Sequence, residues 1–183
     1  MDSIDNFLNE AVKIVGKNYV VQDLETLTFY STDIFSTANE QAVAIIRPGN
    51  ADELIHVSQI CIKNEVPLIV RGGGASYTGG YLPVVKNTIM IDTQRLKNIE
   101  INVEDMFVTV EPGVTWLELY EALKPLGLRT PFWGPFSGRV STIGGSMSYH
   151  AISHGTNNSL SADSLASMQV VIGNGDVIET GSK

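Results

Sequence analysis

The segment that most restricts how this chain can fold is a glycine-rich stretch directly after a short apolar run. Residues 71–80 read Arg-Gly-Gly-Gly-Ala-Ser-Tyr-Thr-Gly-Gly, and the apolar run Pro67–Val70 precedes them. Glycine adopts backbone angles that other residues avoid, and it has no Cβ to keep a ligand at a distance. The stretch is therefore predicted to form a loop at the end of a buried strand, with its backbone open to close approach.

Strand and helix patterns around this loop predict the first part of the fold. Ala42–Arg47 and Thr88–Asp92 are short apolar runs of the kind that form buried strands. Between Ala42–Arg47 and Pro67–Val70, the segment Ala51–Asn64 carries apolar residues at helical spacing. The order strand, helix, strand predicts a βαβ unit with parallel strands and a right-handed crossover.

The N-terminal residues are predicted to form one helix and a connecting segment. Apolar residues fall on one face of a helix that Ser3 can cap and Gly16 can end. Gln22–Glu40 shows no clean period, so we assign it no regular structure. We expect residues 1–37 to be this helix and connector, ahead of a main domain over residues 38–183.

The second half of the chain carries patterns typical of antiparallel strands. Ile99–Val103 alternates apolar and polar residues and Phe107–Val110 follows an acidic break, so the two runs are expected to pair. Thr115 can cap a helix over residues 116–124, and the Asn-Gly pair at 174–175 is a strong hairpin signal. We therefore predict an α+β fold in two lobes, a small βαβ lobe followed by a larger mixed or antiparallel sheet with helices.

Composition excludes several classes of protein. Among 183 residues, 20 acidic against 12 basic side chains give a net charge of −8, which argues against nucleic acid or an anionic membrane as the main partner. No run of 18 apolar residues is present and the acidic N-terminus is unlike a secretory signal, so we expect no membrane span and a cytoplasmic location. The single cysteine, Cys61, excludes a disulfide framework, and its place on the apolar helical stripe predicts a buried, unreactive thiol.

The glycine-rich loop is also the strongest candidate for a ligand site. Its glycines let backbone N–H groups converge, Ser76 and Thr78 add hydroxyl donors, and Arg71 adds positive charge, as in loops that hold phosphate or pyrophosphate. The loop lacks the Gly-Lys-Ser/Thr of a Walker motif, and Tyr77 stands where the Rossmann pattern needs its third glycine. A flexible turn without a ligand is the alternative interpretation.

A second cluster of small residues strengthens the ligand interpretation. Ser141–Ser148 contains a Gly-Gly pair between hydroxyl side chains, and Pro112-Gly113 marks a strand end. Two Gly/Ser-rich loops on separate lobes predict a crevice between them that a long cofactor would fit.

The order of these motifs resembles the FAD-binding domain of the vanillyl-alcohol-oxidase superfamily, the PCMH-type domain. The likeness is greatest to FAD-linked dehydrogenases of glycolate, D-lactate and other 2-hydroxy acids. Six blocks between about Tyr30 and Lys183 carry it: Y-S-T-D, A-I-I-R-P-G-N-A-D-E-L, V-P-L-I-V-R-G-G-G-A-S-Y-T-G-G, V-E-P-G-V-T-W, S-T-I-G-G-S and V-V-I-G-N-G-D-V-I-E-T-G. The resemblance implies a two-lobed PCMH-type fold that binds FAD.

The resemblance also implies which residues hold the cofactor. In this family the loop matching residues 70–76 wraps the FAD pyrophosphate with main-chain N–H groups, and the segments matching 135–142 and 148–151 lie along the cofactor. Pro112 and the start of the last strand match positions near the nucleotide half. The implied cofactor-binding residues are Val70, Arg71, Gly72, Gly73, Gly74, Ala75, Ser76, Thr78, Gly79, Pro112, Pro135, Phe136, Ser141, Thr142, Gly144, Gly145, Ser148, His150, Ala151 and Ile178.

The chain departs from the family pattern at two places. Members that bond their flavin covalently often carry a histidine where this chain has Ala75, so we expect non-covalent FAD. Residues 152–154 and 157–160 replace the Gly pair and Tyr-Gly that are usual in the hydroxy-acid enzymes. His150 and His154 are four apart but lack a third metal ligand, so packing or a contact at the flavin edge is expected and no metal site is predicted.

The resemblance implies a flavin oxidoreductase acting on a 2-hydroxy acid such as D-lactate or glycolate. In the family a substrate (cap) domain follows the FAD domain, so we expect a fragment whose catalytic residues lie elsewhere and which is inactive alone. The alternative is a non-catalytic or split-enzyme flavin module that needs a second chain or domain. We also expect self-association through an exposed apolar face. Gly73→Val or Gly74→Val should abolish flavin retention, with the fold intact if these glycines line the surface of the crevice.

Overall fold

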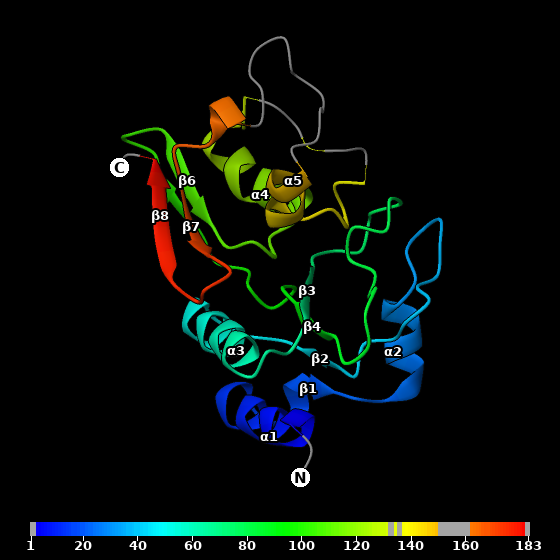
Figure 1. Ribbon diagram of the computed structural model, residues 1–183. Helices are drawn as coiled ribbons and strands as arrows, with labels where there is room; N and C mark the ends of the chain where they lie inside the picture. The colour runs from blue at the N-terminus through cyan, green and yellow to red at the C-terminus, as the bar shows by residue number, and fades with distance from the viewer. Residues whose placement is uncertain (1–2, 132–133, 135–136, 150–161, 182–183) are drawn as a thin grey trace.

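The computed structural model describes residues 3–131, 134, 137–149 and 162–181, and it arranges them in two lobes (Figure 1). The first lobe, at the bottom of Figure 1, contains a four-stranded sheet in the order β1-β2-β4-β3. Its strands are β1 (Val20–Val21), β2 (Ala44–Ile46), β3 (Leu68–Arg71) and β4 (Ile89–Asp92). Strands β2 and β3 both run parallel to β4, whereas β1 is antiparallel to β2. The parallel strands expected from the sequence are confirmed, and β4 lies between β2 and β3.

Helices cover both faces of this sheet. Helices α1 (Ser3–Val15) and α3 (Ala51–Lys63) pack in one apolar cluster with alternate residues of β2 and β4. Helix α2 (Leu24–Tyr30) covers the other face, where Leu27 and Tyr30 meet the opposite residues of β2 and β4. Because successive strand residues point to opposite faces, this double coverage explains why β2 and β4 are buried at every position.

Two expectations for the first lobe are wrong. Pro67–Val70 was expected as a buried strand, but β3 lies at the edge of the sheet, where Leu68 is 37% and Val70 50% exposed. The central position belongs to β4, whose residues are covered on both faces. Gln22–Glu40 was expected to lack regular structure, but it contains α2, which begins after Asp23 because that carboxylate accepts the backbone N–H of Thr26 at 2.9 Å.

The second lobe combines two antiparallel hairpins with two helices, as Figure 1 shows above the first sheet. Its elements are β5 (Ile99–Asn102), β6 (Phe107–Val110), α4 (Trp116–Leu123), α5 (Ile143–Tyr149), β7 (Ser167–Val171) and β8 (Val177–Gly181); short 3-10 turns lie at Lys17–Tyr19, Lys124–Leu126 and Ala162–Ser164. Both predicted strand pairs are confirmed. The predicted cap of α4 is confirmed too, because Thr115 and Glu118 form a reciprocal capping box.

The C-terminal hairpin connects the second lobe back to the first. Its turn holds Gly175 at a φ of 89°, in the left-handed region that favours glycine. The side-chain amide of Gln59 on α3 donates to the Gly175 carbonyl at 3.0 Å. The hairpin is therefore anchored to a helix of the first lobe. Among the described residues, no helix combines the length and apolar character that crossing a membrane requires.

Cys61 gives a first testable prediction. Its side chain is fully buried on α3, as expected, and burial raises the pKa of the thiol to about 12. Because the thiolate is the reactive form, iodoacetamide at pH 8 should leave the native chain unmodified. Mass spectrometry should show complete alkylation once denaturant is added. Equal labelling rates for the native and the denatured chain would contradict this burial.

Candidate functional site

In the glycine-rich loop, the backbone N–H groups of residues 72–76 have no hydrogen-bond acceptor among the described residues. Some of its carbonyl oxygens are engaged: Gly72 O accepts from the side chain of Gln94 at 3.3 Å, and Gly74 O accepts from the Tyr81 hydroxyl at 3.1 Å. By contrast, no described residue accepts a hydrogen bond from the N–H groups of residues 72–76. A run of consecutive backbone donors without acceptors is a ready binding surface for an anion.

Arg71 lies directly beside this row of donors. It is only 5% exposed, and its guanidinium carbon is 4.1 Å from the centre of the Tyr30 ring and 5.1 Å from that of Tyr81. A Cβ on Gly74 would overlap the guanidinium, so the positive charge is in contact with the loop. The Nε atom of Arg71 is buried without a hydrogen-bond partner, and within the described ranges no carboxylate pairs with this side chain. An uncompensated buried cation favours a negatively charged ligand beside it.

Asp33 fixes the far end of the loop. Its carboxylate accepts the backbone N–H groups of Gly79 at 2.7 Å, Ser36 at 2.6 Å and Phe35 at 2.8 Å. These hydrogen bonds, led by that of Ser36, lower the pKa of Asp33 below its usual 3.8. The backbone N–H of Ile34 also donates to the Ser76 carbonyl at 3.3 Å. The Y-S-T-D segment therefore holds the loop in place through Asp33.

Asp33 yields a prediction about loop order. We expect Asp33→Ala to increase amide hydrogen exchange at Gly79 by about tenfold, the scale for losing a hydrogen bond to a charged group. Because the pKa is lowered by folding, the stabilisation is present above about pH 4 and is lost as pH falls through the lower, folded value. Protection at Gly79 that is the same in wild type and variant, measured by NMR at pH 6, would contradict this role.

The second cluster meets the glycine loop in direct contact. A Cβ on Gly72 would overlap the Thr142 hydroxyl, and a Cβ on Gly73 would overlap the carbonyl oxygen of Val140. The expected crevice is therefore closed at these two glycines, because only residues without side chains let the two backbones approach so closely. Segments 71–74 and 140–145, far apart in the sequence, form one continuous surface.

Helix α5 begins inside the second cluster, which the sequence analysis treated as a loop. The helix tolerates two glycines because its start is fixed by its neighbours. The Gly144 N–H donates to the Pro112 carbonyl at 3.0 Å, and that of Gly145 donates to the Thr142 hydroxyl at 3.2 Å. A Cβ on Gly144 would press on Pro112. Pro112 is thus joined to the same surface as Thr142.

The remaining predicted residues divide into three groups. The hydroxyls of Ser76 and Thr78 lie 3.2 Å apart and bond to each other, and Ala75 is half-buried beside them. Ser148 is exposed and donates to the Gly144 carbonyl at 2.8 Å. Ile178 is 39% exposed on β8 of the C-terminal hairpin, and Val70 directly precedes the loop with its side chain on the exposed side of β3. Predictions that fall outside the described residues are Pro135, Phe136, His150, Ala151 and His154.

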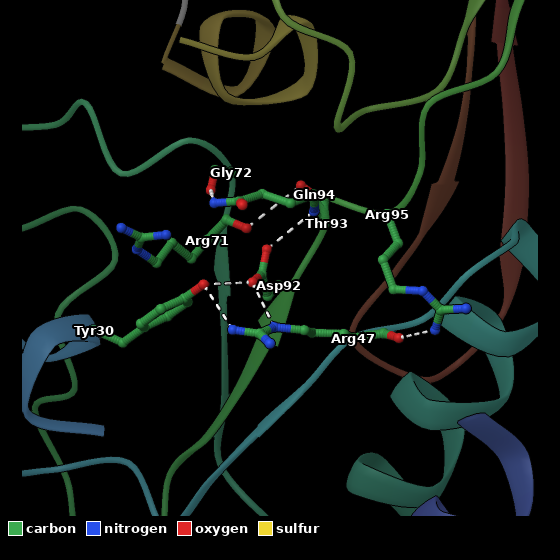
Figure 2. A network of polar contacts seen from close by, with 8 residues as sticks. All are labelled: Tyr30, Arg47, Arg71, Gly72, Asp92, Thr93, Gln94 and Arg95. Carbon is green, nitrogen blue, oxygen red and sulfur yellow. Dashed lines mark hydrogen bonds and ion pairs between the residues drawn. The ribbon is translucent and has the colours of Figure 1, made fainter. Parts of the chain in front are cut away.

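Sequence reasoning missed a buried polar network beneath the loop, which Figure 2 shows. Asp92, 1% exposed, accepts the Tyr30 hydroxyl at 2.8 Å and the Nε of Arg47 at 3.1 Å. Its other oxygen accepts the backbone N–H of Gln94 at 3.0 Å, and the Gln94 side chain bonds to the Gly72 carbonyl. Burial, together with the charge of Asp92, raises the pKa of Tyr30. A signal was present, since an aspartate that ends an apolar strand needs a partner when it is buried.

This arrangement is suited to binding an anionic, nucleotide-like cofactor on a glycine-rich surface. The family described as "FAD binding domain" matches residues 42–181. The chain belongs to this family of FAD binding domains, and FAD as cofactor is confirmed.

Two curated relatives agree with this assignment. The chain is 32% identical over 155 residues to the glycolate oxidase subunit GlcD of Bacillus subtilis, covering 84% of this chain and 33% of that protein. It is 34% identical over 145 residues to the mitochondrial D-lactate dehydrogenase [cytochrome] of Arabidopsis thaliana, covering 76% and 24%. The relatives are a glycolate oxidase subunit and a D-lactate dehydrogenase, and the chain spans a third of their length or less.

Solved structures confirm the two-lobed α+β fold. An alkyldihydroxyacetonephosphate synthase matches with a TM-score of 0.87 at 20% identity, covering 96% of this chain and 35% of that one. The 4-ethylphenol oxidase from Gulosibacter chungangensis matches with a TM-score of 0.81 at 25% identity, covering 98% and 35%. The predicted PCMH-type fold of the vanillyl-alcohol-oxidase superfamily is thereby confirmed.

Proposed function

We propose that residues 71–80 bind the pyrophosphate of FAD. The observation that carries this proposal is the row of unbonded N–H groups at residues 72–76 beside the uncompensated charge of Arg71. A pyrophosphate supplies the negative oxygens that this set of donors lacks. The glycines leave the space that a Cβ would fill, so the ligand can reach the backbone.

The other cofactor contacts in the proposal follow the family resemblance. Pro112, Thr142 and the Gly144-Gly145 pair would line the path of the cofactor beyond the pyrophosphate, since they share a surface with the loop. Further contacts proposed by resemblance are those of Pro135, Phe136, Ser141, Ser148, His150, Ala151 and Ile178. Ala75 has no side-chain nucleophile, so the proposed FAD is held without a covalent bond at this position.

For the whole protein we propose oxidation of a small 2-hydroxy acid. Support comes from the names of the relatives, a glycolate oxidase subunit and a D-lactate dehydrogenase. When bound, FAD accepts a hydride from the carbon that carries the hydroxyl group. The described residues of this chain would bind the cofactor and fix its orientation, and a further domain would position the substrate.

A flavin-binding module that needs a second chain or domain is the second candidate. It shares the proposed flavin site with the first candidate and leaves the substrate contacts to another chain or domain. Self-association belongs to the same proposal, because the edge strand β3 exposes Leu68 and Val70 beside unpaired backbone groups. Sedimentation velocity should then show a dimer that dissociates on dilution. A monomer at all concentrations would contradict the proposed self-association.

Fluorescence titration with two flavins tests the cofactor site. Because the proposed contact is to pyrophosphate, FAD should bind at least about tenfold more tightly than riboflavin, the change for one charged contact. The bound flavin should stay in the supernatant when the protein is precipitated with acid. Equal affinity for FAD and riboflavin would contradict the pyrophosphate site, and flavin in the pellet would contradict non-covalent binding.

Dye reduction with added substrate separates the two candidate functions. The chain, loaded with excess FAD, is given glycolate or D-lactate and an artificial electron acceptor without oxygen. The module candidate predicts no reduction above the rate with free FAD, since positional errors near one ångström already slow such reactions strongly. Reduction above that control would place the substrate contacts within this chain.

A further inference from the structure

Within the described part of the chain Arg71 forms no ion pair, although a buried carboxylate is close by. Its guanidinium stacks on the ring of Tyr30 at 4.1 Å, and the hydroxyl of the same ring donates to Asp92 at 2.8 Å. Figure 2 shows Arg71 beside the ring of Tyr30 and Asp92 at the hydroxyl group of the same residue. A carboxylate and a guanidinium separated by one ring attract each other strongly in a buried environment. Something must therefore compete for the charge of Asp92.

Arg47 is that competitor. Its Nε lies 3.1 Å from Asp92 and its Nη2 donates to the Tyr30 hydroxyl at 3.0 Å, so it satisfies both groups at once. Arg47 is itself held in place, because its carbonyl accepts Arg95 Nη1 at 2.6 Å, and Arg95 lies 3.3 Å from the centre of the Tyr19 ring. The pair of Arg47 with Asp92 is electrically neutral, and it leaves the charge of Arg71 unbalanced.

The other acidic group near the loop is also occupied. Asp33 accepts three backbone N–H groups, including that of Gly79, and forms no ion pair within the described residues. Asp92 is also connected to the loop itself, through Gln94 to the carbonyl of Gly72. Both carboxylates are thus satisfied by groups other than Arg71.

We propose that Arg47 is a positioning residue for the flavin site: by neutralising Asp92 it keeps Arg71 available to the FAD pyrophosphate. The inference rests on the proposed pyrophosphate site. Without Arg47, the carboxylate of Asp92 would be free to pair with the guanidinium of Arg71. Its negative charge would then cancel the positive potential at the loop. The effect of Arg47 on the cofactor is therefore exerted through two other side chains.

Double-mutant analysis tests the proposal through the direction in which each variant changes the affinity for FAD. Arg47→Met should weaken FAD binding by about tenfold, the scale of one lost charge contact. Asp92→Asn should leave the affinity equal or higher, because it removes the competing charge. The double variant should bind within about threefold of wild type, since neither charge remains. A merely structural network predicts the opposite, with Asp92→Asn and the double variant weaker than wild type, and that result would overturn the proposal.

Matched controls separate charge from folding. Lys97→Met changes the net charge by the same amount and breaks the exposed Lys97–Glu118 pair at 2.6 Å, so FAD affinity should not change. Arg47→Lys keeps the charge and should retain most of the affinity. Arg47→Met leaves the buried carboxylate of Asp92 without its partner. If that variant does not fold, the FAD affinities of Arg47→Lys and Asp92→Asn provide the same comparison. Weak binding by Asp92→Asn would then be the contradicting result.

The resonance of the Arg71 Nε–H group gives a readout that needs no flavin. In the wild-type chain this group has no partner among the described residues, and Arg47→Met should shift its NMR signal as Arg71 pairs with Asp92. An unchanged signal in folded Arg47→Met would overturn the inference. A wild-type chain that binds no FAD, but whose Arg71 signal shifts in the variant, would overturn the proposed function and support the control of Arg71 by Arg47.

Discussion

Replacing Gly73 with alanine should lower the affinity for FAD by about a hundredfold, the change expected when binding groups move by about one ångström. A Cβ at this position would overlap the carbonyl oxygen of Val140, which is backbone and has no other rotamer to adopt. One of the two segments must move away, and the N–H groups of residues 72–76 move with it. The same shift should lower stability by about 1–3 kcal/mol, as for other overpacked sites.

Flavin titration and thermal unfolding of the same samples measure both effects. Gly173→Ala is the matched control, because nothing lies within 4 Å of its added Cβ and its φ is not in the left-handed region. The sequence expectation that Gly73→Val leaves the fold intact holds only for a glycine on an open surface, and the Val140 contact excludes that. A Gly73→Ala chain with wild-type affinity would remove this glycine from the proposed site.

Arg71→Met is expected to move affinity and stability in different directions. The affinity for FAD should fall by about ten- to hundredfold, because a buried charged donor of the proposed pyrophosphate site is lost. The unfolding temperature of the flavin-free chain should stay equal or rise, since Arg71 is 5% exposed with an unpaired Nε, and a buried charge without a partner is costly. Contacts between the methionine sulfur and the rings of Tyr30 and Tyr81 replace part of the lost stacking.

Differential scanning fluorimetry with and without FAD checks both directions at once. Arg129→Met, at an exposed position, makes the same change in charge and should alter neither quantity. The affinity of wild type should depend more steeply on salt than that of Arg71→Met, because ions screen the contact that the variant lacks. Identical salt dependence would place Arg71 in the core packing alone.

The elements with strong local signals could be predicted from the sequence. The cap at Thr115, the Asn-Gly turn at 174–175 and the apolar spacing of α3 each depend on neighbouring residues, and the structure confirms all three. Helix α2 was missed because apolar side chains stand on its exposed side as well. Leu24 and Phe29 are 70% and 67% exposed, which blurs the one-sided pattern that marks a helix.

Only part of the candidate site could be predicted from the sequence, for a related reason. Glycines in the loop indicate an open backbone, but nothing local says that Val140 lies against Gly73. Helix α5 was hidden by its two glycines, since glycine is a poor helix former and the contact of Gly144 with Pro112 that requires it is made across the fold. The pairing of Tyr30 with Asp92 spans 62 positions, and a single sequence carries no record of such a partner.

The C-terminal hairpin anchored on α3 is synthesised after the first lobe. This order limits when the surface of the candidate site can be complete during synthesis. Strands β1 to β4 are complete once Asp92 has been made, so the first lobe can fold while the ribosome is still working. At that stage the glycine loop has neither Val140 nor Thr142 to close against. The contact between Gln59 and Gly175 bridges 116 positions and cannot form before Gly175 has been made. The proposed pyrophosphate site is therefore incomplete until Thr142 has been made, so we expect a chain that stalls after the first lobe to form the sheet without retaining FAD.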